Sequence, residues 1–389
     1  MGYISEGRMP IQYEGKEHFY YQNRLRKRRR KIESIQFEDL IDAYHKLDDK
    51  NEDQEPEYMV EEKLKQILND IRNGDYGPSK VRKVKIPKSS GGTRELNIPS
   101  VLDRVVAKAV LARLTPVVDP KFDCRSHGGR PDRGIQSAIA EAYKAIEAGM
   151  HYVLAADIKD AFPNTPTEAA ISILEKQSGQ HPCMELAKVC IRGHKGAKRK
   201  IGVDQGNPLS PICFNAYMGE WVDSQVPRDA DIRYVRYLDN LYLFGKDLMK
   251  LANVMANINQ VLTDKGFVLK TDPCRDLNFE KLPILGFQIG LEESKIVILG
   301  EADMGYHMAA SLAGAYEKPN SHKLGKPIVD SWISSQALRT SWDLKDTHKV
   351  NELLDYYGFQ YKVNHEEVIK ELQDQRISWV QKYNLNNNQ

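Results

Sequence analysis

The chain has 389 residues, which is enough for two or three structural units around a sizeable apolar core. Its 56 Lys and Arg residues nearly balance its 54 Asp and Glu residues, so the formal net charge is +2 and the protein is not a polycation. A surface for nucleic acid would therefore need segregated cations. The five cysteines form no CxxC pair, which argues against zinc or disulfide frameworks and favours a reducing cytoplasm. No apolar run is long enough to span a membrane.

A basic run lies close to the N-terminus, where seven cations occupy the eight positions from Arg24 to Lys31. Because these cations would fall on every side of a helix, contact with nucleic-acid phosphates is favoured over a single solvated face. The candidate nucleic-acid-binding residues of this run are Arg24, Arg26, Lys27, Arg28, Arg29 and Arg30. Apolar residues then recur at helical spacing from Phe37 and from Leu64, which predicts a basic, helical N-terminal extension.

The stretch from Val81 to Pro99 predicts a β-hairpin that turns at residues 89–92. Its cations alternate along the strands, and Lys88 and Arg94 flank the turn. Such a hairpin could bring positive charge to a triphosphate, whereas a solvated surface hairpin is the alternative. An alanine-rich helix is predicted to follow over residues 101–114.

A short, nearly apolar run from Tyr152 to Ala156 predicts a buried strand, and Asp157 comes directly after it. Pro163 to Pro166 interrupts regular structure, and a helix is expected to begin near Thr167. A carboxylate at the end of a buried strand suits Mg²⁺, which binds one or two carboxylates together with substrate phosphates. Taken alone, the same pattern also fits an ordinary strand end with a solvated Asp.

A glycine-rich basic loop is predicted shortly before Gln205. Its candidates for contact with a nucleic-acid backbone are Lys198, Arg199 and Lys200. Exposed loops are often basic without such a role, so this interpretation depends on the rest of the chain.

Two β-rich arms, residues 231–237 and 241–244, predict a hairpin with Asp239 at its tip. Two strands that each end in a carboxylate can share two metal ions about 3.5–4 Å apart, an arrangement suited to in-line phosphoryl displacement. Residues 285–289 are strand-like as well. Beyond residue 291 the patterns are helical, with Trp332, Trp342 and Trp379 as apolar anchors.

Six motifs, in order, resemble those of one family. DIKDAF (157–162), QGNPLSP (205–211) and RYLDN (236–240) resemble the palm motifs of bacterial reverse transcriptases of the group II intron-like class. Segments 86–99, 103–106 and 126–131 resemble the fingers motifs of the same class. The resemblance covers roughly residues 80–290. It implies an α+β right-hand polymerase, in which an antiparallel palm sheet flanked by helices joins fingers and a helical thumb.

The resemblance also implies where these parts begin and end. The expected divisions are a basic helical N-terminal extension at 1–75, fingers at 76–145, palm at 146–290, and a helical thumb with a C-terminal tail at 291–389.

The implied reaction is attack of a primer 3′-hydroxyl on the α-phosphate of a deoxynucleotide. The catalytic positions would be Asp157, Asp239 and Asn240, and two Mg²⁺ ions (or Mn²⁺) would be held at Asp157, Ile158 and Asp239. The positions that would bind the dNTP are Lys88, Arg94, Phe162, Gln205 and Lys270. In this family the bulky ring at Phe162 would collide with a ribose 2′-hydroxyl, which implies a preference for dNTPs.

The implied partners are an RNA template, favoured as a dedicated non-coding RNA, a DNA product and dNTPs. A homo-oligomer or a partner protein is left open, and no membrane association is expected. Compact members of this class include bacterial anti-phage and abortive-infection enzymes, a setting that is favoured over a retron or a trimmed intron protein. The template and the way synthesis is primed stay open.

Asn240 is the main departure from the family pattern, because an amide replaces the second carboxylate of the Tyr-x-Asp-Asp hairpin. An Asn oxygen can still coordinate a metal, so catalysis stays the favoured interpretation. The alternative is a degenerate polymerase fold that acts as a non-catalytic RNA-binding or assembly partner. An RNA-dependent RNA polymerase is a third interpretation, against which Phe162 argues.

Overall fold

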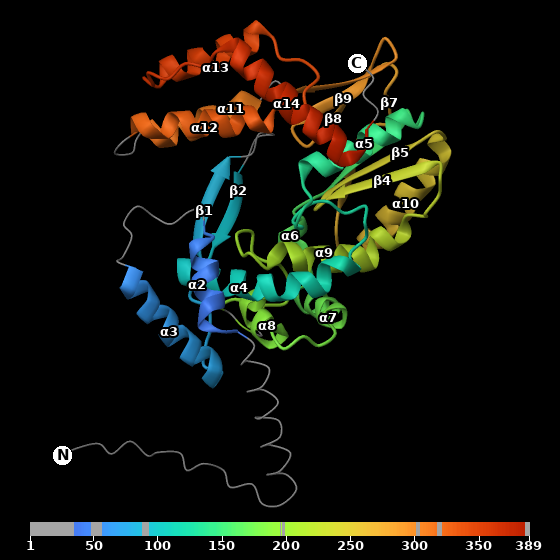
Figure 1. Ribbon diagram of the computed structural model, residues 1–389. Helices are drawn as coiled ribbons and strands as arrows, with labels where there is room; N and C mark the ends of the chain where they lie inside the picture. Colours follow the sequence, from blue (N-terminus) through green and yellow to red (C-terminus); the bar gives the residue numbers. More distant parts are fainter. Residues whose placement is uncertain are drawn as a thin grey trace, which may run out of the picture. The chain divides into compact units, whose positions relative to one another are not determined.

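The structure is a computed structural model that describes residues 35–47, 57–87, 93–194, 196, 199–300, 304–316 and 321–385 (Figure 1). The basic run from Arg24 to Lys31 lies outside these residues, as do Lys88 and Lys198. The chain forms two compact units. Unit 1 consists of the described residues within Met1–Ile86, Thr93–Lys121 and Phe162–Tyr217. Unit 2 consists of the described residues within Pro87–Gly92, Phe122–Ala161 and Met218–Gln389.

Unit 1 is built mainly from helices. Its elements are α2 (Phe37–His45), α3 (Glu57–Asn73), β1 (Arg82–Pro87), β2 (Thr93–Ile98), α4 (Val101–Val118), η1 (Asp119–Lys121), α6 (Ala161–Asn164), α7 (Thr167–Ser178), α8 (Met184–Arg192) and the first part of α9 (Ser210–Trp221). β1 and β2 form a two-stranded sheet, as predicted for residues 81–99. The predicted helix at 101–114 is α4, which packs against α2, α7 and α8 and fully buries Val106, Val110 and Leu114.

Unit 2 contains an antiparallel sheet with the order β4–β5–β3–β6, and β7 also pairs with β3. Its strands are β3 (Tyr152–Ile158), β4 (Ile232–Tyr237), β5 (Asn240–Gly245), β6 (Leu269–Thr271) and β7 (Arg275–Asp276). The predicted strand at 152–156 is confirmed, but it continues to Ile158, so Asp157 lies inside the strand. Because β3 is paired along both edges, it is the central strand of the sheet, and its apolar run is buried.

Helices flank the faces of this sheet (Figure 1). Val153 and Ala155 belong to the same apolar cluster as α5 (Ile135–Glu147), which packs against β4 and β5. On the other face, α10 (Leu248–Asp264) packs against β3, β5 and β6. Because side chains alternate along a strand, Asp157 lies on the same face as Val153 and Ala155.

A second antiparallel sheet in unit 2 has the order β10–β9–β8. Its strands are β8 (Leu282–Ile284), β9 (Phe287–Glu292) and β10 (Lys295–Gly300). The sequence predicts a strand over 285–289, whereas Leu285 and Gly286 form the turn between β8 and β9. Both residues have positive φ angles, 49° and 86°, which suit a tight hairpin turn and interrupt a strand.

The predicted C-terminal helices are confirmed within the described residues. They are α11 (Met304–Tyr316), α12 (Ser321–Ser335), α13 (Leu344–Tyr356) and α14 (His365–Tyr383). These helices share an apolar core that includes Leu312, Val329 and Leu354. Trp379 of α14 anchors them to α5, because its indole nitrogen donates to the Gln136 carbonyl oxygen at 3.1 Å.

The described residues therefore confirm the predicted α+β class, with an antiparallel sheet flanked by helices and a helical C-terminal part. The four-part division at residues 75, 145 and 290 stays a prediction. Within the described ranges, no helix combines the length and the apolarity needed to cross a membrane.

Candidate active site

The central strand β3 brings three predicted site residues of unit 2 together. Asp157 pairs with Asn240 of β5 on one side and with Lys270 of β6 on the other. Directly opposed residues of an antiparallel pair have Cβ atoms about 4.5–5.5 Å apart and share a face. Asp157 and Asn240 are half-buried, and Lys270 is exposed. The three side chains therefore form one row across the end of the sheet, with the carboxylate in the middle.

Asp239 lies beside this row, in the turn between β4 and β5. Tyr237 pairs with Asn240, so the turn has two central residues, Leu238 and Asp239. The Ile158 amide donates to the Asp239 carbonyl oxygen at 3.0 Å, which ties the turn to the end of β3. The Asn240 side-chain amide donates to an Asp239 carboxylate oxygen at 3.4 Å. The predicted hairpin is confirmed, and it brings Asp239 and Asp157 to the same end of the sheet.

The donor groups at this end of the sheet fit Mg²⁺. Asp157, Asp239 and Asn240 offer the oxygen ligands that this ion prefers. Ile158 is fully buried and aliphatic, so only its main-chain carbonyl could be a ligand. In the part of the chain that the structure describes, no group of three or more His, Cys, Asp or Glu side chains is arranged to hold a metal ion. The two carboxylates thus suit an ion that takes its remaining ligands from substrate phosphates.

Phe162 and Gln205 belong to unit 1. The Phe162 side chain is 8% exposed and stacks on Phe214, with ring centroids 4.8 Å apart and planes inclined by 21°. The Phe162 carbonyl oxygen accepts a hydrogen bond from the Val203 amide at 3.0 Å. Phe162 of α6 is therefore fixed against the segment that leads to Gln205.

The loop that carries Gln205 is anchored to β2 and to Arg199. The Asn97 amide donates to the Gln205 carbonyl oxygen at 3.1 Å, and the Asn97 side chain donates to Asp204 at 2.9 Å. The buried Asp204 carboxylate also accepts two hydrogen bonds from the Arg199 guanidinium, at 2.8 and 2.7 Å. This ion pair engages the Arg199 guanidinium within the loop, and the predicted contact of Arg199 with nucleic acid stays a prediction.

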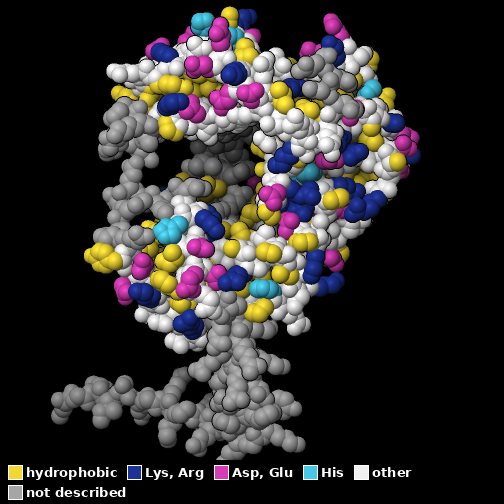
Figure 2. Space-filling model, viewed as in Figure 1, with side chains coloured by type: hydrophobic (Ala, Val, Ile, Leu, Met, Phe, Trp, Pro, Cys, Tyr) yellow, Lys and Arg dark blue, Asp and Glu magenta, His cyan; other side chains and the backbone are white. Residues whose placement is uncertain are grey.

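The other predicted binding residues are placed only in part. Arg94 lies in β2, and Lys200 is exposed after the basic loop. Lys88, Lys198 and the cations from Arg24 to Arg30 lie outside the described residues. On the face drawn in Figure 2, Lys and Arg side chains are interspersed with Asp and Glu side chains. Nucleic-acid contact by these cations stays a prediction.

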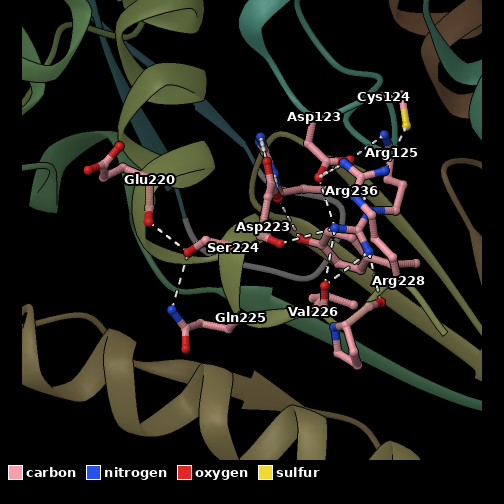
Figure 3. Close-up of polar contacts among 12 residues, drawn as sticks. Asp123, Cys124, Arg125, Glu220, Asp223, Ser224, Gln225, Val226, Arg228 and Arg236 are labelled. Atoms are coloured by element: carbon pink, nitrogen blue, oxygen red, sulfur yellow. Dashed lines mark hydrogen bonds and ion pairs between the residues drawn. The ribbon is translucent and has the colours of Figure 1, made fainter. Parts of the chain in front are cut away.

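Sequence reasoning missed three buried polar residues of unit 2 that lie against the β4–β5 hairpin. Arg236 of β4 forms an ion pair with Asp223 of η3 (Asp223–Gln225), as Figure 3 shows. The His127 amide donates to the Arg236 carbonyl oxygen at 2.8 Å. The signal in the sequence is an Arg directly between Val235 and Tyr237 in a predicted strand, since a buried Arg requires a partner.

The buried His127 predicts a pH dependence of stability. Burial, with the nearby Arg133 charge, lowers the pKa of His127 from 6.5 to about 4. Between these values the unfolded chain binds a proton that the folded chain does not, so stability falls as the pH is lowered. The expected loss from this group is about 3 kcal/mol between pH 7 and pH 4, measured by urea unfolding.

His127→Asn is the control for this prediction, because an amide can keep the hydrogen bond that Nδ1 of His127 forms with the Ser137 hydroxyl at 2.8 Å. The variant should lose the corresponding part of the pH dependence. An identical pH dependence in both proteins would show that His127 is protonated equally in the folded and unfolded states.

Comparison with known proteins identifies relatives of this chain. Residues 86–289, more than half of the chain, match the family model described as reverse transcriptase (RNA-dependent DNA polymerase). The chain is 30% identical over 191 residues to protein YkfC of Escherichia coli strain K12. It is also 30% identical over 169 residues to the group II intron-encoded protein LtrA of Lactococcus lactis subsp. cremoris.

The alignment with YkfC covers 46% of this chain and 47% of YkfC. The alignment with LtrA covers 41% of this chain and 28% of LtrA. The chain thus aligns with less than half of either relative. Among solved structures, apo telomerase from Candida tropicalis aligns over 84% of this chain and 64% of its own, with 12% identity and a TM-score of 0.45. A likeness at that level is too distant to support an inference.

Proposed function

The chain belongs to the reverse transcriptase (RNA-dependent DNA polymerase) family, and we propose that it is an RNA-directed DNA polymerase that extends a 3′-hydroxyl end with dNTPs. The observation that carries the proposal is the register of β3, which aligns Asp157 with Asn240 and Lys270 and brings Asp239 to the same end of the sheet. Because the chain aligns with less than half of YkfC or LtrA, its activity, substrates and partners all belong to the proposal.

In the proposed reaction, Asp157 and Asp239 would hold two Mg²⁺ ions, which would supply activation of the attacking hydroxyl and neutralisation of charge on the leaving pyrophosphate. Asn240 orients the Asp239 carboxylate through its side-chain amide. Lys270 is exposed and in register with Asp157, which supports its role as the proton donor to pyrophosphate.

A primer-extension assay tests this function. The purified chain should add dNTPs to a primer on an RNA template, and incorporation should require a divalent metal. Untemplated and protein-primed reactions belong in the assay, because the way that synthesis begins is open. Absence of incorporation in every reaction, with nucleic-acid binding retained, would favour the degenerate scaffold that the missing second carboxylate at Asn240 allows.

Phe162 is proposed to exclude ribonucleotides. Phe162→Val should raise the kcat/KM for rNTPs relative to dNTPs by about tenfold or more, since relief of a clash worth about 1.4 kcal/mol already gives that factor. The ring is anchored on Phe214, so its position is fixed rather than adaptable. The measurement is single-nucleotide incorporation with matched dNTP and rNTP.

Phe214→Leu is the matched control, because it removes the stacking partner but keeps the Phe162 side chain itself. It should change selectivity less than Phe162→Val does. If the wild-type enzyme uses rNTPs as readily as dNTPs, Phe162 does not exclude ribonucleotides. That result would favour the interpretation of the chain as an RNA-dependent RNA polymerase.

The proposed setting is anti-phage defence in bacteria, with a dedicated non-coding RNA as template. Its support is the motif resemblance to bacterial intron-like enzymes, a class that includes defence-associated members, together with 30% identity to an intron-encoded protein. Sequencing of the nucleic acid that co-purifies with the chain tests this setting. One dominant structured RNA is expected, whereas a random sample of cellular RNA would count against it.

A further inference from the structure

We propose that Arg236 is a positioning residue for the catalytic turn, where its guanidinium, anchored by the buried Asp223, holds the Leu238 carbonyl and thereby fixes Asp239. The inference rests on the proposed function insofar as Asp239 is a metal ligand there. The orientation of the turn itself can be measured without activity.

Arg236 and Asp223 form a two-point ion pair in the interior of unit 2 (Figure 3). Nε of Arg236 donates to Oδ1 of Asp223 and Nη2 donates to Oδ2, both at 2.7 Å. The side chains are 0% and 1% exposed. Burial alone would lower the pKa of Arg236, but the Asp223 carboxylate outweighs it and the pKa is raised. The guanidinium therefore stays charged and keeps its fixed set of donors.

One of these donors is directed at the catalytic turn. Nη1 of Arg236 donates to the Leu238 carbonyl oxygen at 3.2 Å. That carbonyl belongs to the planar peptide that links Leu238 to Asp239, so the bond sets the orientation of this peptide. Leu238 has a φ angle of 53°, which residues other than glycine rarely adopt. Such a conformation persists only where the surroundings enforce it, and Arg236 supplies one enforcing contact.

Gly128 holds the same turn from another side. A Cβ atom at Gly128 would lie 2.8 Å from the Leu238 amide nitrogen and 2.8 Å from its Cγ atom. The backbone at Gly128 thus packs directly on the turn. The adjoining segment pairs with β4, because the Arg236 amide donates to the Arg125 carbonyl oxygen at 2.9 Å and the His127 amide donates to the Arg236 carbonyl oxygen at 2.8 Å.

Arg125 keeps Asp223 in place. Its guanidinium donates to the Asp123 carboxylate at 2.8 Å and to the Asp223 carbonyl oxygen at 3.1 Å (Figure 3). The anchor of Arg236 is therefore fixed through its main chain as well as through its carboxylate.

A contribution to stability alone would not require this pair of residues. Replacing a buried ion pair by apolar side chains of similar volume is often neutral or stabilising. An apolar side chain at position 236, however, could not donate to the Leu238 carbonyl. Tyr234 provides the contrast, because its hydroxyl donates to the same Asp223 carboxylate at 3.0 Å and is directed at Asp223 rather than at the turn.

The experiment compares the wild-type chain with Arg236→Lys, Gly128→Ala and Tyr234→Phe. Lys keeps the charge but cannot reach both Asp223 oxygens and the Leu238 carbonyl, while a methyl group at Gly128 displaces the turn from the other side. Hydrogen exchange of the 237–241 segment reports the turn directly. The Mg²⁺ concentration for half-maximal incorporation reports metal binding, and changes that disturb the support of a metal ligand typically weaken it about 10–100-fold.

Arg236→Lys and Gly128→Ala should speed exchange at the turn and raise the Mg²⁺ requirement by about tenfold or more, with Tyr234→Phe close to wild type in both. Equal changes in Tyr234→Phe, or none in Arg236→Lys, would overturn the proposal. If Arg236→Lys does not fold, the comparison of Gly128→Ala with Tyr234→Phe decides. A wild-type chain without incorporation would contradict the proposed function, while hydrogen exchange would still decide whether Arg236 positions the turn.

Discussion

Replacing Asp157 or Asp239 by alanine is expected to lower dNTP incorporation by about 10³-fold or more. Loss of a metal ligand removes several kcal/mol of transition-state stabilisation, and each ~1.4 kcal/mol corresponds to a factor of ten in rate. Both side chains are half-buried at the end of the sheet rather than in its core, so the variants should fold. Single-nucleotide incorporation at saturating dNTP measures the effect, and circular dichroism checks the fold.

Asp160→Asn is the matched control for these variants. Asp160 is exposed, follows Asp157 by three residues, and has a φ angle of 46°, which Asn tolerates well. This variant should retain most of the wild-type incorporation. If a folded Asp157→Ala or Asp239→Ala protein still incorporates dNTPs at the wild-type rate, the substituted residue is not an essential metal ligand.

The two elements that carry these carboxylates could be predicted because their signals are local. The apolar run before Asp157 has the length of a buried strand, and the arms on either side of Asp239 are rich in β-branched, aromatic and other apolar residues. The motif resemblance then supplied the pairing of the two elements. The fold class followed from these local patterns and from their order along the chain.

Contacts between residues far apart in the chain could not be predicted in the same way. Nothing local in the sequence indicates that Lys270 lies opposite Asp157, because register depends on the whole sheet. The ion pair of Arg199 with Asp204, only five residues further along, was missed for a different reason, since a basic loop has the same sequence pattern whether its cations face solvent or a buried carboxylate. The turn at Leu285 was missed because an apolar residue gives no sign of a positive φ angle.

Arg236 shows the same limit at the candidate site. It belongs to the RYLDN motif, but the motif gives no sign that its side chain is fully buried against Asp223. The two residues lie 13 positions apart, and only the path of the chain through η3 and β4 brings them together. The sequence pattern therefore located the ligands, and the structure was needed to find what supports them.

Asp223→Ala is expected to destabilise the fold by about 3–5 kcal/mol, because it leaves the Arg236 charge buried without its partner. Both side chains are essentially inaccessible to solvent, so water cannot replace the lost contacts. The control is Asp231→Ala, whose carboxylate is 49% exposed and lies 3.4 Å from Lys250. An exposed ion pair of that kind contributes about 1 kcal/mol or less. Urea unfolding at neutral pH measures both variants.

A double variant separates the stability of this pair from its effect on the turn. Asp223→Leu combined with Arg236→Met removes both charges and fills a similar volume, so it should recover most of the stability that Asp223→Ala loses. It still lacks the donor to the Leu238 carbonyl, so hydrogen exchange at residues 237–241 should remain faster than in the wild type. If the double variant recovers stability and exchanges at the turn as slowly as the wild type, Arg236 contributes to stability only and does not position the turn.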